Sequence, residues 1–146
     1  MIVGSYRDGM PSVEGIIRLP GSGRSAPVSF VVDTGSCATI ISQADVFNRL
    51  GIRRRELVRA PTPVQGMGGE ASLLEYRGDA ELDFEGLDAA IPFTLQTPAD
   101  SQTLLPFSLL GQDILHRFAL LAYKASGRVL LLTHAEVTAA LEAIGP

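Results

Sequence analysis

Short runs of apolar and β-branched residues, interrupted every few positions by glycine or proline, extend along almost the whole of this chain. The 15 glycines and 9 prolines are spread along the sequence and are not gathered in one tract. Because these residues end strands and form tight turns, the pattern predicts an all-β fold of many short strands. The length of 146 residues fits a single domain, residues 1–146.

Most of the expected strands fall into consecutive pairs joined by turn residues, as in hairpins. The pairs are residues 13–19 with 27–32, 57–64 with 71–76, 80–84 with 89–95, and 119–123 with 128–132. Single strands are expected at 38–41 and 108–111, and a loop at 97–103. Helices are expected after Ser42 up to Gly51, over residues 112–118, and from a capping box of Thr133 and Glu136 to Ile144.

Charge and cysteine content exclude several functional classes. A formal charge of −4 gives no extended basic surface for nucleic acid, and Arg53-Arg54-Arg55 is a short exception expected at a solvated helix exit. Cys37 is the single cysteine, so a disulfide framework and multi-cysteine metal sites are excluded, and no metal or cofactor is expected. The sequence has no apolar window long enough for a membrane span, and we expect a soluble protein of the cytoplasm.

The tripeptide Asp33-Thr34-Gly35 has an unusual position for an acidic residue. It follows the apolar residues 30–32 directly and precedes another apolar, β-branched segment, so the sequence predicts a tight turn between two buried strands. A carboxylate that close to a core is costly unless it is hydrogen-bonded or shares a proton. These residues alone leave two interpretations open, a turn-stabilising aspartate and a catalytic one.

Three segments in this order resemble the retroviral-like (retropepsin-like) aspartic proteases. They are the Asp33-Thr34-Gly35-Ser36 turn with the apolar residues before it, the glycine-rich segment Gly66-Met67-Gly68-Gly69, and Leu109-Leu110-Gly111-Gln112-Asp113-Ile114-Leu115. With the strands around them, the resemblance covers residues 13 to about 132. It implies a closed retropepsin-like β-barrel, the acid protease fold, with a short helix after Gly111.

The resemblance also implies a homodimer in which each copy supplies Asp33 to one cleft. The two carboxylates would share a proton and activate a water molecule against a peptide bond. Thr34 would join the two turns across the dimer, and Gly35 would leave room for the substrate backbone. Residues 66–69 would form a flap, in which Gly66, Met67, Gly68 and Gly69 close over an extended, largely apolar peptide or protein substrate.

The sequence departs from the retroviral pattern at two positions. Retroviral members usually carry an acidic residue where Cys37 stands and an arginine where Gln112 stands, and these two form an ion pair. The chain also continues into the expected C-terminal helix, where retroviral members end in a strand of the dimer sheet. Dimer geometry is therefore left open.

Other interpretations remain. A cysteine hydrolase would need a base beside Cys37, and the two histidines, His116 and His134, lie in the C-terminal third. Asp113 is expected to cap a helix start and not to act as a second acid. The alternative function is a catalytically idle retropepsin-like dimer that serves as a peptide-binding or dimerisation module.

Overall fold

The computed structural model describes residues 1–66, 69–100 and 105–145, and most of its regular structure is β-strand. The strands are β1 (Ile2–Arg7), β2 (Met10–Leu19), β3 (Arg24–Val32), β4 (Leu57–Arg59), β5 (Val64–Gly66), β6 (Gly69–Ala71), β7 (Leu73–Tyr76), β8 (Ala80–Asp83), β9 (Ile91–Phe93), β10 (Gln96–Pro98), β11 (Ser108–Leu110), β12 (Ala119–Tyr123) and β13 (Arg128–Leu132). The helical segments are η1 (Asp45–Arg49), η2 (Arg54–Glu56), α1 (Gln112–Leu115), η3 (Lys124–Ser126) and α2 (His134–Ile144).

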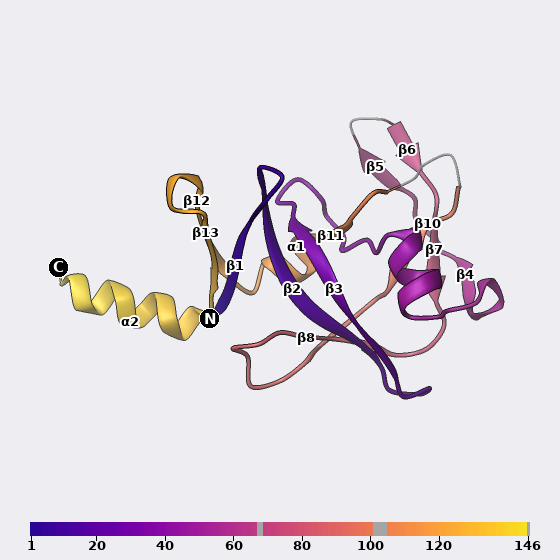
Figure 1. Ribbon diagram of the computed structural model, residues 1–146, viewed down its shortest axis with the longest axis horizontal. Coiled ribbons are helices and arrows are strands. Elements are labelled where there is room, and N and C mark those ends of the chain that lie inside the picture. The colour runs from indigo at the N-terminus through magenta and orange to yellow at the C-terminus, as the bar shows by residue number, and fades with distance from the viewer. Residues whose placement is uncertain (67–68, 101–104, 146) are drawn as a thin grey trace.

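The strands form one large curled sheet and two small ones (Figure 1). The large sheet has 8 strands in the order β11-β3-β2-β1-β13-β12, with β8 and β9 branching from β2. A second sheet has the order β10-β7-β4, and β5 pairs with β6 alone. The prediction of an all-β fold is confirmed, as are the four hairpin pairs at the level of strand order.

The core forms where alternate residues of β2 and β3 face the same side. Ile17 and Phe30 are fully buried, and they are joined by Leu82 and Phe84 from the segment that branches off β2. The Phe30 and Phe84 rings lie 6.4 Å apart between centroids in a tilted arrangement, a favourable geometry for aromatic pairs. The period-two alternation seen in the sequence therefore selects which face of each strand is buried.

The N-terminal strand β1 was not predicted from the sequence. It pairs with β2 on one side and with β13 on the other, and so links the first hairpin to the last one. Its apolar content is limited to Ile2, Val3 and Tyr6, with Gly4 and Ser5 between them, which gives little periodic signal. Pairing with two partners decides the conformation of this segment.

Three local predictions were wrong in extent. Residues 38–41 form only a single bridge, between Ile40 and Leu109, instead of a strand. Residues 97 and 98 belong to β10, which pairs with β7, so the expected loop begins later, and residues 101–104 lie outside the described residues. The helix expected over 112–118 is the shorter α1, Gln112–Leu115.

The other two helices follow their predicted boundary signals. Ser42 Oγ accepts a hydrogen bond from Asp45 N at 3.2 Å, and Gly51 ends this helical segment with a φ of +65°. Thr133 and Glu136 form the capping box of α2. Among the described residues, no helix is long and apolar enough to cross a membrane.

Candidate active site

The loop that contains Asp33 begins where β3 ends, and backbone hydrogen bonds fix its shape. Asp33 N donates to Leu110 O at 3.0 Å, and Ser36 N donates back to Asp33 O at 3.2 Å. The side chain of Asp33 is half-buried, and its Oδ1 accepts a hydrogen bond from Gly35 N at 2.9 Å. The predicted tight turn is therefore present, with a carboxylate whose direction is set by the turn itself.

Strand β11 lies between the two arms of this loop and is hydrogen-bonded to both. It pairs in parallel with the end of β3, where Leu109 is opposite Val31. On its other side, Ile40 N donates to Leu109 O at 3.0 Å and Leu109 N donates to Ile40 O at 2.8 Å. The two arms of the loop are thus hydrogen-bonded to the same short strand, so a segment far away in the sequence determines where Asp33 lies.

Three polar groups connect the loop to the start of α1. The fully buried Thr39 donates from Oγ1 to Asp113 Oδ1 at 2.7 Å and accepts from Gly111 N at 3.1 Å. Asp113 Oδ1 also accepts from Ile114 N at 3.0 Å. The prediction that Asp113 serves the helix start is consistent with these contacts, and the aspartate additionally anchors the second arm of the Asp33 loop.

Gln112 makes two further bonds to the loop. Its Nε2 donates to Thr34 O at 2.9 Å, and its backbone N donates to Ser36 O at 2.8 Å. Cys37 is exposed and is a free thiol. A neutral amide therefore ties the Asp-Thr-Gly turn to α1, at the position where the resemblance would place an arginine.

The glycine-rich segment forms a hairpin that stands out from the body (Figure 1). Strands β5 and β6 pair so that Gly66 is opposite Gly69, and Gly69 has a φ of +103°. Met67 and Gly68, which the sequence analysis places at the flap tip, lie outside the described residues. The hairpin prediction is confirmed for the described part.

A small apolar cluster connects the base of this hairpin to the Asp33 loop. Its buried members are Ile40, Ala60 and Leu73, and Val64 and Ala38 pack against them. Ile40 and Ala38 follow the Asp33 turn, and Val64 begins β5. The base of the hairpin and the residues that follow the Asp33 turn therefore share one set of packed side chains.

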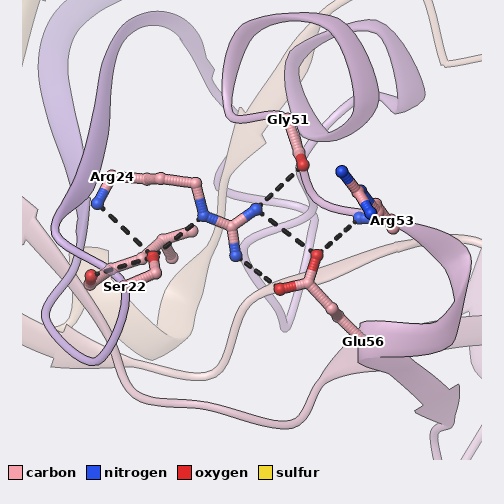
Figure 2. Close-up of polar contacts among 6 residues, drawn as sticks. Ser22, Arg24, Gly51, Arg53 and Glu56 are labelled. Atoms are coloured by element: carbon pink, nitrogen blue, oxygen red, sulfur yellow. Dashed lines mark hydrogen bonds and ion pairs between the residues drawn. The ribbon is translucent and has the colours of Figure 1, made fainter.

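A charge cluster around Arg24 lies at the opposite end of β3 from the Asp33 loop, and Figure 2 shows its contacts. Arg24 donates from Nη1 to Gly51 O at 2.8 Å and forms a two-pronged ion pair with Glu56, which also accepts from Arg53 N at 2.7 Å. The hydrogen bond from Arg24 lowers the pKa of Glu56 below its usual value of 4.5. This cluster joins the β2–β3 turn to the segment before β4 and has a structural role.

Within residues 1–66, 69–100 and 105–145, no group of three or more His, Cys, Asp or Glu side chains could hold a metal ion. His116 Nδ1 is 2.9 Å from Gln112 O, within its own helix end. The site therefore offers one aspartate in a shaped turn, together with an adjacent hairpin.

Thr39 is the site residue that the sequence analysis missed. A threonine in a β-branched run carries no signal of its own, and its partner Asp113 lies 74 positions away. The two side chains come into contact only because β11 lies between β3 and Ile40. Knowledge of that strand order would have identified the pair.

Comparison with known proteins defines the family. A profile of the family described as "gag-polyprotein putative aspartyl protease" matches residues 21–117, about two thirds of the chain. The chain belongs to this family. The match includes the Asp33 turn, the β5–β6 hairpin and α1 of the retropepsin-like chain.

Solved structures agree on the fold. A retropepsin-like aspartic protease from Rickettsia conorii superposes with a TM-score of 0.56 at 19% identity, covering 90% of this chain and 88% of that one. EIAV protease, solved in complex with the inhibitor HBY-793, gives a TM-score of 0.53 at 21% identity, covering 77% of this chain and 91% of that one. No curated protein matches this retropepsin-like chain significantly. The retropepsin fold predicted from the sequence is confirmed.

Proposed function

We propose that two copies of this chain form an aspartic endopeptidase with one active centre, to which each copy contributes Asp33. The observation that supports this most directly is the Asp33 turn: a half-buried carboxylate is oriented by Gly35 N and held by β11, in a chain of the aspartic protease family. The sequence contains a single Asp-Thr-Gly. A pair of aspartates of this kind therefore requires a second copy.

The chemistry follows from bringing two such carboxylates together. At about 3 Å they cannot both ionise, and the pair shares one proton. The ionised aspartate takes a proton from a bound water molecule, whose oxygen attacks the carbonyl carbon of the peptide bond. The protonated aspartate donates to the carbonyl oxygen, so a tetrahedral intermediate forms without a covalent bond to the enzyme.

The neighbouring residues have supporting roles in this proposal. Thr34 is exposed next to Asp33 and joins the two turns across the dimer. A side chain on Gly35 would begin only 3.3 Å from Asp33 Oδ1, so glycine keeps the approach to the carboxylate open. The carbonyl of Thr34 accepts a hydrogen bond from Gln112 Nε2, which helps to keep the turn in place.

The substrate is proposed to be an extended peptide segment with largely apolar side chains. The hairpin of β5 and β6 offers backbone groups near its tip for pairing with an extended chain, in the manner of an added strand. Gly66, Met67, Gly68 and Gly69 would form the tip that closes over it. Closure would exclude bulk water from the cleft, while the one bound water molecule that attacks the peptide bond stays between the two aspartates.

Peptide cleavage by the wild type and by Asp33→Asn, measured over a range of pH, tests the proposal. The variant should lose cleavage while its circular dichroism remains that of the wild type. Asp8→Asn is a matched control, because Asp8 lies in a turn with a φ of +48°, which asparagine also adopts. Retained cleavage by Asp33→Asn would refute the aspartic mechanism, and peptide binding without cleavage by the wild type at every pH would identify the idle binding module.

A further inference from the structure

The three strands at the chain ends, β1, β13 and β12, form a part of the large sheet that is apolar on both faces. Ile2 and Leu131 are paired in the register, and both are buried in the core. The next row consists of Val3, Leu130 and Leu121, which are paired across the same strands. Since successive residues of a strand face opposite sides, this row lies on the outer face.

The outer face has little cover. Val3 is 66% exposed, Leu121 50% and Tyr123 59%, and Leu130 lies between Val3 and Leu121. We call these four residues the outer patch. The edge strand β12, which carries Leu121 and Tyr123, is exposed along its whole length. It has no charged residue and no proline, the residues that usually protect such an edge from pairing.

Helix α2 carries an apolar stripe that also lacks cover. Val137, Leu141 and Ile144 recur at helical spacing, and Leu141 is 63% and Ile144 80% exposed. No residue of this helix is buried, and Figure 1 shows it extending away from the sheets. A helix of 11 residues is only marginally stable without packing partners.

The direction of α2 is fixed by its start. The helix follows β13 after the single residue Thr133, whose N and Oγ1 both donate to Glu136 Oε2, at 2.8 and 2.9 Å. There is no linker that would let the helix fold back onto the outer patch of its own chain. The stripe and the patch are thus two apolar surfaces of one chain that do not meet.

Charges beside the two surfaces have opposite signs. Lys124 and Arg128 lie at the turn between β12 and β13, and Glu142 lies on α2 next to Leu141. None of the three takes part in an ion pair within the described residues. A helix that lay across the outer patch could bring such groups together.

We propose that the occupant of the outer patch is α2 of a second copy, and that two copies exchange their helices reciprocally. The inference rests on the proposed function, because one Asp33 per chain makes the active centre incomplete without the second copy. Reciprocal exchange uses the same two surfaces twice and closes after two subunits. The dimer is thereby held by the terminal strands and α2 and not by an ion pair at Cys37 and Gln112.

Sedimentation velocity over a concentration series tests the exchange. Leu141→Glu changes the stripe and Leu121→Glu changes the patch; each should raise the dimer dissociation constant roughly 100-fold, since two buried leucines are lost per dimer. Val58→Glu is the matched control: Val58 is 39% exposed on β4, and this variant should dimerise like the wild type. Circular dichroism checks folding, and Ile144→Glu serves as a second stripe variant.

Mixing the two variants gives a sharper test. A heterodimer of Leu141→Glu with Leu121→Glu has one intact helix-on-patch contact, whereas each homodimer has none. The mixture should therefore dimerise more tightly than either variant alone, an outcome that general destabilisation does not produce.

The outcomes separate the two proposals. If the wild type is a dimer that cleaves peptides and both Glu variants dimerise equally well, the exchange is wrong and the proposed function stands. A wild type that dimerises through these surfaces without cleaving peptides would leave the exchange intact and reject the protease. A wild type that stays monomeric at all concentrations would reject both, and the surfaces would then serve another partner.

Discussion

Gly111→Ala should damage both stability and activity, because Gly111 touches the backbone of the Asp33 loop. A Cβ atom at this position would overlap the carbonyl carbon and oxygen of Ala38 and would lie 2.9 Å from Thr39 N. These are backbone atoms, so no side chain can rotate away. The loop arm must therefore shift, and this weakens two hydrogen bonds: the one that Thr39 Oγ1 accepts from Gly111 N and the one that Ser36 O accepts from Gln112 N.

The expected loss follows from these contacts. Overpacking costs about 1–3 kcal/mol, and each of the two weakened hydrogen bonds costs about 1 kcal/mol, so a loss of about 3–5 kcal/mol is expected. That is a large share of a typical stability of about 5–15 kcal/mol. Urea denaturation measures the loss in free energy of unfolding. Peptide cleavage in the absence of urea shows whether the shifted loop still holds Asp33 in its active position.

Gly21→Ala is the control for this experiment, since a Cβ at Gly21 would meet nothing within 4 Å. It should unfold at nearly the same urea concentration as the wild type. If Gly111→Ala matches the wild type in both assays, the close approach of α1 to the Asp33 loop does not determine the site.

Three further predictions concern other parts of the molecule. Because the pKa of Glu56 is depressed in the folded protein, its ion pair with Arg24 stabilises the fold at pH values above the unfolded pKa of about 4.5. This stabilisation is lost as the pH falls through the lower folded pKa. Glu56→Gln should therefore show a smaller fall in urea midpoint between about pH 6 and pH 3 than the wild type. Gly69→Val should slow peptide turnover more than it lowers the urea midpoint, because a β-branched residue is strained at a φ of +103° in the hairpin; unchanged kinetics would identify an ordinary loop. Specific activity should fall on dilution, and excess Asp33→Asn subunits should inhibit the wild type through mixed dimers; a fully active monomer in the ultracentrifuge would contradict the shared pair.

Elements whose signals are local were predicted well from the sequence. The turn at Asp33 and the capping box of Thr133 and Glu136 depend on residues within a few positions, and both are present. The hairpin around Gly66 and Gly69 likewise follows from adjacent segments separated by glycines. The retropepsin-like fold itself was predicted from the family resemblance, which depends on three motifs in a fixed order along the chain.

Elements decided by distant partners could not be predicted in this way. Strand β1 exists because β2 and β13 pair with it, and residues 96–98 are a strand because β7 lies beside them. Residues 38–41 have strong β-propensity, yet among them only Ile40 forms a β-bridge, to Leu109 of the three-residue strand β11. Propensity was overridden by the availability of hydrogen-bonding partners.

The position of β11 between the two arms of the Asp33 loop also has a consequence for folding. Leu110 must pair with Val32, 78 positions earlier, before the loop can take its shape. Contacts of such long range close late, after the entropy of a large loop has been lost. A nascent chain that has not yet released β11 from the ribosome therefore lacks an ordered Asp33 turn, so the strand order itself delays the appearance of the site until residues 108–110 have emerged.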